Sequence, residues 1–347
     1  MFYRIFPLLV LAPLVATTAF AAPAQKQFSD WQVTCNNQNF CSARNTGLHQ
    51  GFVMTLSRGA GARNDVNLRL DLGNLESTDV KVPPIEPRLR LDGEPILLRH
   101  NEWKVSPHHL MTNSVEAINA LLNEIANGDK ITLADGAGLI SLSGLKASLL
   151  FIDSQQKRIG SETAWIRKGD GPSLSVPPVP PLKEVTAPSA APAPLSRDEL
   201  SDLLDYGTWR MNNSQCSLDP LRREVRVSSL TDDKALMLTS CEAGAYNIVY
   251  LAWVVSRQKP FVARAIRLRL PFMPDSGNTD LELMNAGFED HAKELTTLAK
   301  GRGAGDCGVA TRWRYDGQRF RLVRYAEEPA CDGWHKADGW PTLWVTK

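Results

Sequence analysis

Prolines crowd into one stretch of this chain, residues 169–195, and no other feature limits the possible fold as strongly. Eight prolines fall in it, with alanine and serine between them. Proline lacks a backbone N–H and has a fixed φ, so such a stretch neither pairs inside a sheet nor continues a helix. It predicts a semi-rigid, polyproline-like linker between two domains of similar size, residues 22–168 and 196–347. A long surface loop within a single domain is the alternative, although such loops are uncommon.

Residues 1–21 have the pattern of an export signal. Arg4 is the only charged residue among them, a short apolar run follows, and Ala19 and Ala21 offer the small side chains that a signal peptidase accepts. We therefore predict a signal peptide at 1–21 and a periplasmic or secreted protein. The apolar run is short for a bilayer and holds two prolines, which disfavours an uncleaved membrane anchor. No later apolar run is long enough to span a bilayer, so no stable membrane insertion is expected after cleavage.

Export gives meaning to the six cysteines, because cysteines pair in an oxidising compartment. Their positions fall in local pairs, which predicts three bridges: Cys35–Cys41, Cys216–Cys241 and Cys307–Cys331. Each bridge is expected to stabilise the fold by about 2–4 kcal/mol. A metal site or a redox pair is the alternative, but no Cys-x-x-Cys motif occurs. We expect structural disulfides and no cofactor.

Charge is balanced along the chain, with 39 lysines and arginines against 38 aspartates and glutamates and a formal net charge of +1. A near-neutral protein has no global attraction to nucleic acid or to anionic membranes, so nucleic acid is not an expected partner. The content of 43% hydrophobic and 22% charged residues is typical of a folded globular chain. Any electrostatic recognition must therefore be local.

Period-two alternation of apolar and polar residues dominates the first half and predicts antiparallel strands. The clearest run is 66–72, and further strands are expected within 28–35, 51–56, 89–98 and 103–105. Two helices are expected to pack on this sheet, one capped by Thr112 or Asn113 and one capped by Ser143. Residues 22–27 are expected to be a polar lead.

The second half opens with a capping box, Ser196 to Glu199, and a short helix. Strands are expected at 224–230, 235–241, 246–255 and 261–270. Residues 286–300 fit either a helix or two short strands. The predicted fold class is therefore mainly β, with antiparallel, sandwich-like sheets and a few short helices, which makes a β-rich α+β protein.

Four arginines of a predicted C-terminal hairpin form the strongest candidate binding site. Two strands meet at the turn residues Asp316-Gly317. Alternation puts four large apolar residues on one face, namely Trp313, Tyr315, Phe320 and Leu322. The other face carries Arg312, Arg314, Arg319 and Arg321. Guanidinium groups bind sulfate, phosphate or carboxylate through bidentate hydrogen bonds. The alternative is a solvated face whose charge is offset by neighbouring carboxylates.

Carboxylates gather in the same stretch: Asp306, Glu327, Glu328, Asp332 and Asp338. A paired general acid and base would suffice for glycoside hydrolysis. Proximity in the sequence does not set the distance between two carboxyl groups, so the catalytic residues of such an enzyme stay unknown.

Three histidines, His100, His108 and His109, lie around Trp103 and raise the question of a metal site. Their spacing does not match the i, i+4 pair of a helix-borne metal site. We predict ordinary histidines in a surface loop and no bound metal.

Several motifs resemble known families. Phe28-Ser-Asp-Trp-Gln-Val-Thr-Cys35, Cys41 and Ser141-Leu-Ser-Gly-Leu-Lys-Ala147 resemble the invasion-associated locus B family of exported bacterial proteins, over residues 28–168. Over residues 28–347 the chain is more similar to a proteobacterial secreted family catalogued as a domain of unknown function, through Lys300–Gly308 and Trp340–Trp344. The resemblance implies a periplasmic or secreted location and a β-rich fold, and it carries no catalytic residues.

The sequence favours an exported, non-enzymatic binding module of the bacterial envelope, with an unknown envelope or host protein or glycan as its partner. One alternative is a hydrolase of envelope polymers that uses the C-terminal carboxylates. Another is a protein inhibitor that fills a hydrolase cleft with the hairpin stapled by Cys307 and Cys331. An exposed basic patch would favour binding, whereas a hollow with converging carboxylates of separated pKa would favour an enzyme.

Overall fold

The structure is a computed structural model that describes residues 22–63, 65–73, 83–188 and 192–347. The predicted signal peptide at 1–21 lies outside these residues. Within them the fold is mainly β, with 36% strand, 16% helix, five antiparallel sheets and three α-helices, which confirms the fold class that the alternation predicts. None of the helices in the described ranges is long and apolar enough to cross a membrane.

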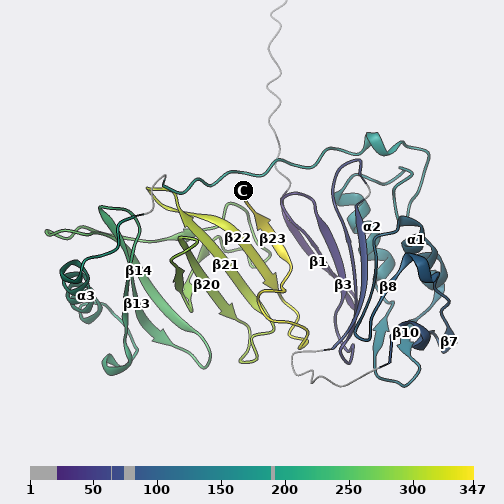
Figure 1. The fold of residues 1–347 in the computed structure, drawn as a ribbon, viewed down its shortest axis with the longest axis horizontal. Helices are drawn as coiled ribbons and strands as arrows, with labels where there is room; N and C mark the ends of the chain where they lie inside the picture. Colours follow the sequence, from purple (N-terminus) through teal and green to yellow (C-terminus); the bar gives the residue numbers. More distant parts are fainter. Residues whose placement is uncertain (1–21, 64, 74–82, 189–191) are drawn as a thin grey trace, which may run out of the picture.

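A seven-stranded antiparallel sheet organises the first half (Figure 1). In spatial order its strands are β1 (Ala24–Phe28), β2 (Trp31–Cys35), β3 (Cys41–Asn45), β4 (Phe52–Arg58), β5 (Val66–Leu72), β9 (His109–Thr112) and β8 (Lys104–Val105). The expectation of a polar lead at residues 22–27 is wrong, because β1 pairs along its whole length with β2. The surface loop expected around His108 and His109 is also wrong in part, because His109 begins β9 and pairs with Asp71 of β5.

A four-stranded sheet and two helices complete the first half. The sheet has the order β11 (Leu139–Ser141), β10 (Lys130–Leu133), β6 (Leu89–Leu91) and β7 (Glu94–Pro95). The helices are α1 (Val115–Glu124) and α2 (Leu145–Gln155). Helix α2 packs on β1, β2 and β3, and the shared apolar core includes the fully buried Trp31, Met54 and Leu68.

Both helices begin at a residue other than the predicted cap. The N-cap of α1 is Ser114, whose hydroxyl accepts a hydrogen bond from the backbone N–H of Ala117. The N-cap of α2 is Gly144, at φ +97°, where a Cβ would lie 1.9 Å from the carbonyl oxygen of Phe28. The close approach of β1 therefore demands glycine, and the predicted Ser143 cap is not used.

The second half begins with α3 (Arg197–Asn212), which carries the predicted capping box but is longer than expected. The sheet beside it contains β12 (Val225–Ser229), β13 (Lys234–Ala243), β14 (Ile248–Ser256) and β15 (Ala263–Ala265), and β18 (Leu283–Met284) also pairs with β14. A separate ribbon pairs β16 (Leu268–Arg269) with β17 (Asp280–Leu281). The single strand expected at 261–270 is thus split, because the chain changes pairing partner between Ala265 and Leu268.

The last sheet has the order β19 (Gly287–Glu289), β20 (Glu294–Lys300), β21 (Gly308–Tyr315), β22 (Phe320–Glu328) and β23 (Thr342–Val345). Residues 286–300 therefore contain two strands and not a helix. In β21 and β22 the four large apolar residues of the predicted hairpin are buried. The structure contains the three disulfides that locality predicts, Cys35–Cys41, Cys216–Cys241 and Cys307–Cys331.

The described part of the proline-rich segment runs along both halves of the molecule (teal in Figure 1). Val185 donates its backbone N–H to the carbonyl of Lys347 at 3.0 Å, and Lys347 donates back to Lys183 at 2.8 Å. The segment is therefore docked against the C-terminal residues. The apolar clusters on its two sides are separate, one within residues 28–165 and two within residues 195–344.

Candidate functional site

Three hollows in the described part of the chain differ in their lining. The largest, of about 800 Å³, lies between α1 and α2 and is lined mainly by apolar and small polar side chains. A second, of about 250 Å³, lies between the two halves. The third, of about 360 Å³, gathers the most charged side chains of the three, and it includes two of the arginines singled out from the sequence. This third hollow is called the arginine pocket below.

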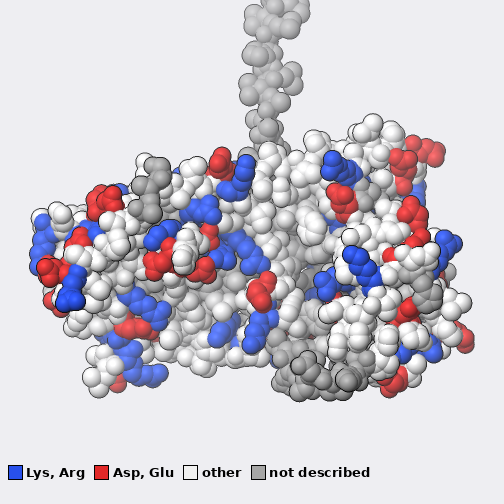
Figure 2. All heavy atoms as spheres, viewed as in Figure 1, with Lys and Arg blue, Asp and Glu red and all other residues white. Residues whose placement is uncertain are grey.

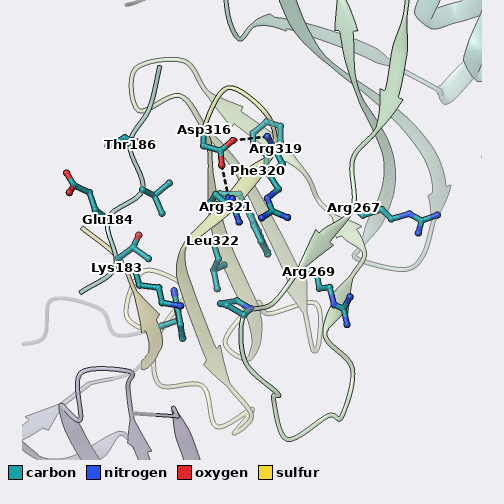
Figure 3. Close-up of a pocket in the computed structure, with 15 residues that line it drawn as sticks. Lys183, Glu184, Thr186, Arg267, Arg269, Asp316, Arg319, Phe320, Arg321 and Leu322 are labelled. Carbon is teal, nitrogen blue, oxygen red and sulfur yellow. Dashed lines mark hydrogen bonds and ion pairs between the residues drawn. The ribbon is translucent and has the colours of Figure 1, made fainter. Parts of the chain in front are cut away.

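Segments far apart in the sequence build the arginine pocket (Figure 3). The docked linker, residues 183–186, forms one wall, and Arg267 and Arg269 form the opposite rim. Between them lie the β21–β22 turn and the start of β22, residues 316–322. The proline-rich segment therefore supplies one wall of the pocket by lying against the last sheet.

Large apolar side chains line the inner part of the arginine pocket: Pro271, Trp313, Phe320, Leu322 and Trp344. The period-two alternation of β21 and β22 turns three of these toward the core. The Nζ atom of Lys183 lies 5.9 Å from the ring centre of Trp344, within the range of a cation–π contact. The pocket thus combines an aromatic floor with a charged rim.

The rim is predominantly basic, with Lys183, Arg267, Arg269, Arg319 and Arg321 against Glu184 and Asp316. Asp316 accepts from the Nε of Arg321 at 2.7 Å and from the backbone N–H groups of Gln318 and Arg319 at 2.9 Å. Burial opposes its ionisation, but these hydrogen bonds outweigh burial and lower the pKa of Asp316. The carboxylate stays ionised and holds Arg321 in place at the tight turn.

The four predicted arginines divide into two pairs. Arg319 and Arg321 line the pocket. Arg312 and Arg314 each donate to Glu294 at 2.8 Å, and Arg314 also donates to the carbonyl of Val185 at 3.0 Å. Arg314 therefore ties the linker wall to the sheet, while Arg312 stays on the strand face, where it also binds Glu289.

Three basic residues of the pocket were not predicted from the sequence: Lys183, Arg267 and Arg269. Lys183 belongs to a segment expected to be a semi-rigid linker between domains. Arg267 and Arg269 lie where the strand expected at 261–270 changes its pairing partner. The repeated Arg-x-Arg spacing at 267–269 and 319–321 was the available signal, although only Arg269 of β16 and Arg321 of β22 lie within strands.

None of the five carboxylates singled out from the sequence lines one of the three hollows, and most of them already accept hydrogen bonds from neighbouring residues. Asp306 is buried and binds Arg302 at 2.8 Å and the backbone N–H of Gly333 at 2.7 Å. Glu327 accepts from the hydroxyl of Tyr325 at 2.8 Å. Asp338 is exposed. None of these three lines the hollows described above.

The remaining two carboxylates converge on one arginine between the halves. Arg44 of β3 donates to Glu328 at 2.9 Å and to Asp332 at 2.6 Å, and all three side chains are at least nine-tenths buried. Burial raises the pKa of Glu328. Burial also opposes ionisation of Asp332, but His49 and Arg44 together hold its pKa at about 2. The two pKa values are pushed apart, yet the groups face an arginine and not an open hollow.

Of the three histidines that raised the metal question, His100 begins a 3-10 helix (His100–Glu102), His109 begins β9, and His108 directly precedes that strand. His109 places its Nδ1 2.6 Å from Asp71, and its ring lies 6.5 Å from that of His108. Across the described residues, no group of three or more histidine, cysteine, aspartate or glutamate side chains is placed to hold a metal ion.

Comparisons with known proteins extend over nearly the whole chain. The family model described as "Protein of unknown function (DUF1176)" matches residues 25–347. The "Uncharacterized protein YpfG" of Escherichia coli (strain K12) is 62% identical over 345 residues, which cover 99% of each chain. No solved structure matches this chain.

Proposed function

This chain belongs to the DUF1176 family of proteins of unknown function, and we propose that it is an exported, non-enzymatic binding module that holds an anionic group in the arginine pocket. One observation carries the proposal. Among the described residues, no carboxylate lies within ion-pair distance of the exposed Arg267, Arg269 and Arg319, although all three line the same hollow.

The chemistry of the lining indicates the class of ligand. Guanidinium forks bind carboxylate, phosphate and sulfate through paired hydrogen bonds. The aromatic floor favours a ring or an apolar stem attached to the anion. A hollow of about 360 Å³ lies within the usual range for a small-molecule site. The ligand class is thus an anionic group on a glycan or on a protein side chain of the envelope or of a host.

Charge over the rest of the molecule supports local recognition. Figure 2 shows basic and acidic side chains interspersed over both halves on the face in view, in keeping with the net charge of +1. A global field therefore contributes little. The predicted signal peptide, the three disulfides and the resemblance of the first half to the invasion-associated locus B family support an envelope location.

The engaged carboxylates favour binding over hydrolysis. A glycosidase needs two carboxyl groups that flank the substrate across an open site, whereas Glu328 and Asp332 share Arg44 in a buried contact. The inhibitor alternative needs a protruding loop at the last disulfide. The residues after Cys331 lie instead against the first half, where Trp334 contacts His49 edge to face at 5.9 Å.

Retention on an immobilised polyanion tests the proposal. Heparin carries sulfate and lipopolysaccharide carries phosphate, so both resins present the proposed chemistry. The variant Arg267→Ala/Arg269→Ala/Arg319→Ala is expected to elute at lower salt than the wild type. A control with the same charge change, Arg197→Ala/Arg222→Ala/Arg264→Ala, removes exposed arginines outside the pocket and is expected to elute as the wild type does. Equal elution of the two variants would contradict the proposal.

A further inference from the structure

The hollow between the two halves is a second site, unrelated to the arginine pocket. It has a volume of about 250 Å³, and both halves line it. Strands β2 to β5 supply the polar residues Gln32, Thr34, Ser42, Arg44, Thr55, Arg69 and Asp71. The C-terminal loop between β22 and β23 supplies Trp334, His335, Gly339 and Pro341. This hollow is called the inter-half cavity.

Strand register explains why the sheet side of the cavity is polar. The core-facing residues of β2 to β5 are apolar, so alternation leaves the polar ones on the outer face. Gln32 lies opposite Arg44, Arg44 opposite Thr55, and Thr55 opposite Arg69. These four side chains therefore form one row across four neighbouring strands, with hydrogen-bonding groups along its length.

The loop that covers this row is held in place by several contacts. Arg44 binds Glu328 and Asp332, which lie near the start of the loop. The Cys307–Cys331 disulfide joins the loop to the residue directly before β21. The buried Trp340 donates its indole N–H to the carbonyl of His335 at 3.2 Å. At Gly339 a Cβ would lie 2.9 Å from the His335 ring, so glycine makes room for the imidazole. The cavity is thus preformed.

Three buried polar atoms around the cavity have no hydrogen-bond partner among the described residues: Gln32 Oε1, Arg69 Nε and His335 Nε2. The Gln32 residue is only 3% exposed. A buried polar group without a partner costs about 1–3 kcal/mol, and these three come from three different segments. Burial, and then the charge of Arg44, lowers the pKa of His335, so its imidazole is neutral at pH 7.

Each charged side chain at the cavity already has an ion-pair partner. Arg44 is paired with Glu328 and Asp332, and Arg69 donates to Asp71 at 2.8 Å. A charged ligand would therefore enter without a free counter-ion, at a cost in desolvation. A neutral ligand with several donors and acceptors fits the three unpartnered atoms and the hydroxyl groups of Thr34, Ser42 and Thr55. The indole of Trp334 offers a flat apolar surface at the loop side.

We propose that the inter-half cavity binds a small neutral polyhydroxylated molecule, of the size of one sugar ring. Hydroxyl groups of such a ring both donate and accept, which suits the Gln32 carbonyl, the Arg69 Nε–H and the His335 imidazole. The Arg69 side chain is 43% exposed, which places the entrance beside β5. The volume is too small for a polymer chain to pass inside, so the ligand is a free monosaccharide or the end residue of a glycan.

Binding of neutral monosaccharides to the purified mature protein tests this assignment. Glucose, galactose, mannose and N-acetylglucosamine are titrated by calorimetry and by ligand-observed NMR, with glucuronate as the anionic comparison. At least one neutral sugar is expected to bind, and to bind more tightly than glucuronate. The assignment would be overturned if none of the sugars bound, so that only water filled the cavity. Binding of glucuronate alone would overturn it as well.

Two substitutions locate the binding. Gln32→Leu and Thr55→Val each remove hydrogen-bonding groups from the row and are expected to weaken binding about tenfold, which corresponds to about 1.4 kcal/mol. Thr132→Val on β10 is the matched control, since Thr132 is a half-buried strand threonine outside the cavity. It is expected to bind as the wild type does, and so is the triple variant of the arginine pocket. Unchanged affinity in Thr55→Val, with its melting temperature retained, would place the sugar elsewhere.

Discussion

Arg44 and Asp332 lie 288 residues apart in the sequence and 2.6 Å apart in the structure. The guanidinium of Arg44 also binds Glu328, so one side chain of the first half contacts two carboxylates of the second. Such a buried cluster stabilises the fold only while its members are paired, because a charge that loses its partner stays buried without compensation.

Removal of Arg44 is therefore expected to be strongly destabilising. Arg44→Met leaves Glu328 and Asp332 buried beside each other, and we expect a loss of about 3–5 kcal/mol in the free energy of unfolding. Urea denaturation followed by tryptophan fluorescence measures it. Arg226→Ala is the control, since Arg226 pairs with Glu224 at an exposed site, where such pairs contribute about 0–1 kcal/mol. Similar losses in both variants would contradict the role given to the cluster.

Acid is expected to loosen the contact between the halves. The pKa of Asp332 is about 2 in the folded protein, below its ordinary value of 3.8. Its stabilisation is complete above the unfolded pKa and is lost as the pH falls from about 4 toward 2, an effect of about 2 kcal/mol. Glu328 acts in the opposite sense, because its raised folded pKa makes its burial unfavourable once it ionises. As the pH is lowered from 6 to 2, the urea midpoint of unfolding should therefore fall more steeply in the wild type than in Asp332→Asn. Parallel curves for the two proteins would refute this account.

Gly308 is expected to tolerate no side chain. It has φ +133°, and a Cβ would lie 2.0 Å from the carbonyl oxygen of Ala299 on the paired strand β20. Gly317, at φ +95°, has open space around it. Both alanine substitutions strain the backbone, but only Gly308→Ala also creates a clash, so its loss of stability should exceed that of Gly317→Ala by about 1–3 kcal/mol. Thermal unfolding measures the difference, and equal melting temperatures would argue against the clash.

The linker wall of the arginine pocket is expected to loosen when one of the hydrogen bonds that hold it is removed. Val185→Pro deletes the N–H that donates to Lys347 and leaves the bonds from Lys347 to Lys183 and from Arg314 to Val185, so residues 183–186 should be held less firmly and heparin retention should fall. Val179→Pro is the control, because Val179 is an exposed linker residue outside the pocket. Both variants should melt near the wild-type temperature. Unchanged retention in Val185→Pro would mean that the linker takes no part in binding.

Local patterns were enough for the fold class and for the disulfide pairs. Alternation identified most long strands, and Asp92-Gly93 and Asp316-Gly317 marked hairpin turns. In the first of these turns Asp92 has φ +51° and Gly93 has φ +97°. The misses have a common cause. The strand β1 exposes polar residues and forms only because β2 offers it an edge. The break between β15 and β16 likewise reflects a change of partner, which no local period encodes.

The candidate sites were predicted only in part for the same reason. Arg321 was accessible to strand alternation, because β22 sets its face, and Arg319 lies in the turn directly before that strand. Lys183 and Arg267 reach the pocket through the docking of separate segments. Within the inter-half cavity, Gln32 and His335 are brought together by contacts between residues some three hundred positions apart. Such pairings depend on the whole fold and leave no short-range signal.

The loop between β22 and β23, which covers the inter-half cavity, also determines at which stage of synthesis and folding the cavity forms. Synthesis proceeds from the N-terminus, so the polar row on β2 to β5 is complete long before the loop after Cys331 emerges. Until that loop arrives and its cysteine pairs with Cys307, the outer face of the first sheet stays open to water and to passing molecules. Assembly order thus makes the cavity a property of the finished, oxidised chain, because its cover, between Trp334 and Pro341, is among the last parts to be made.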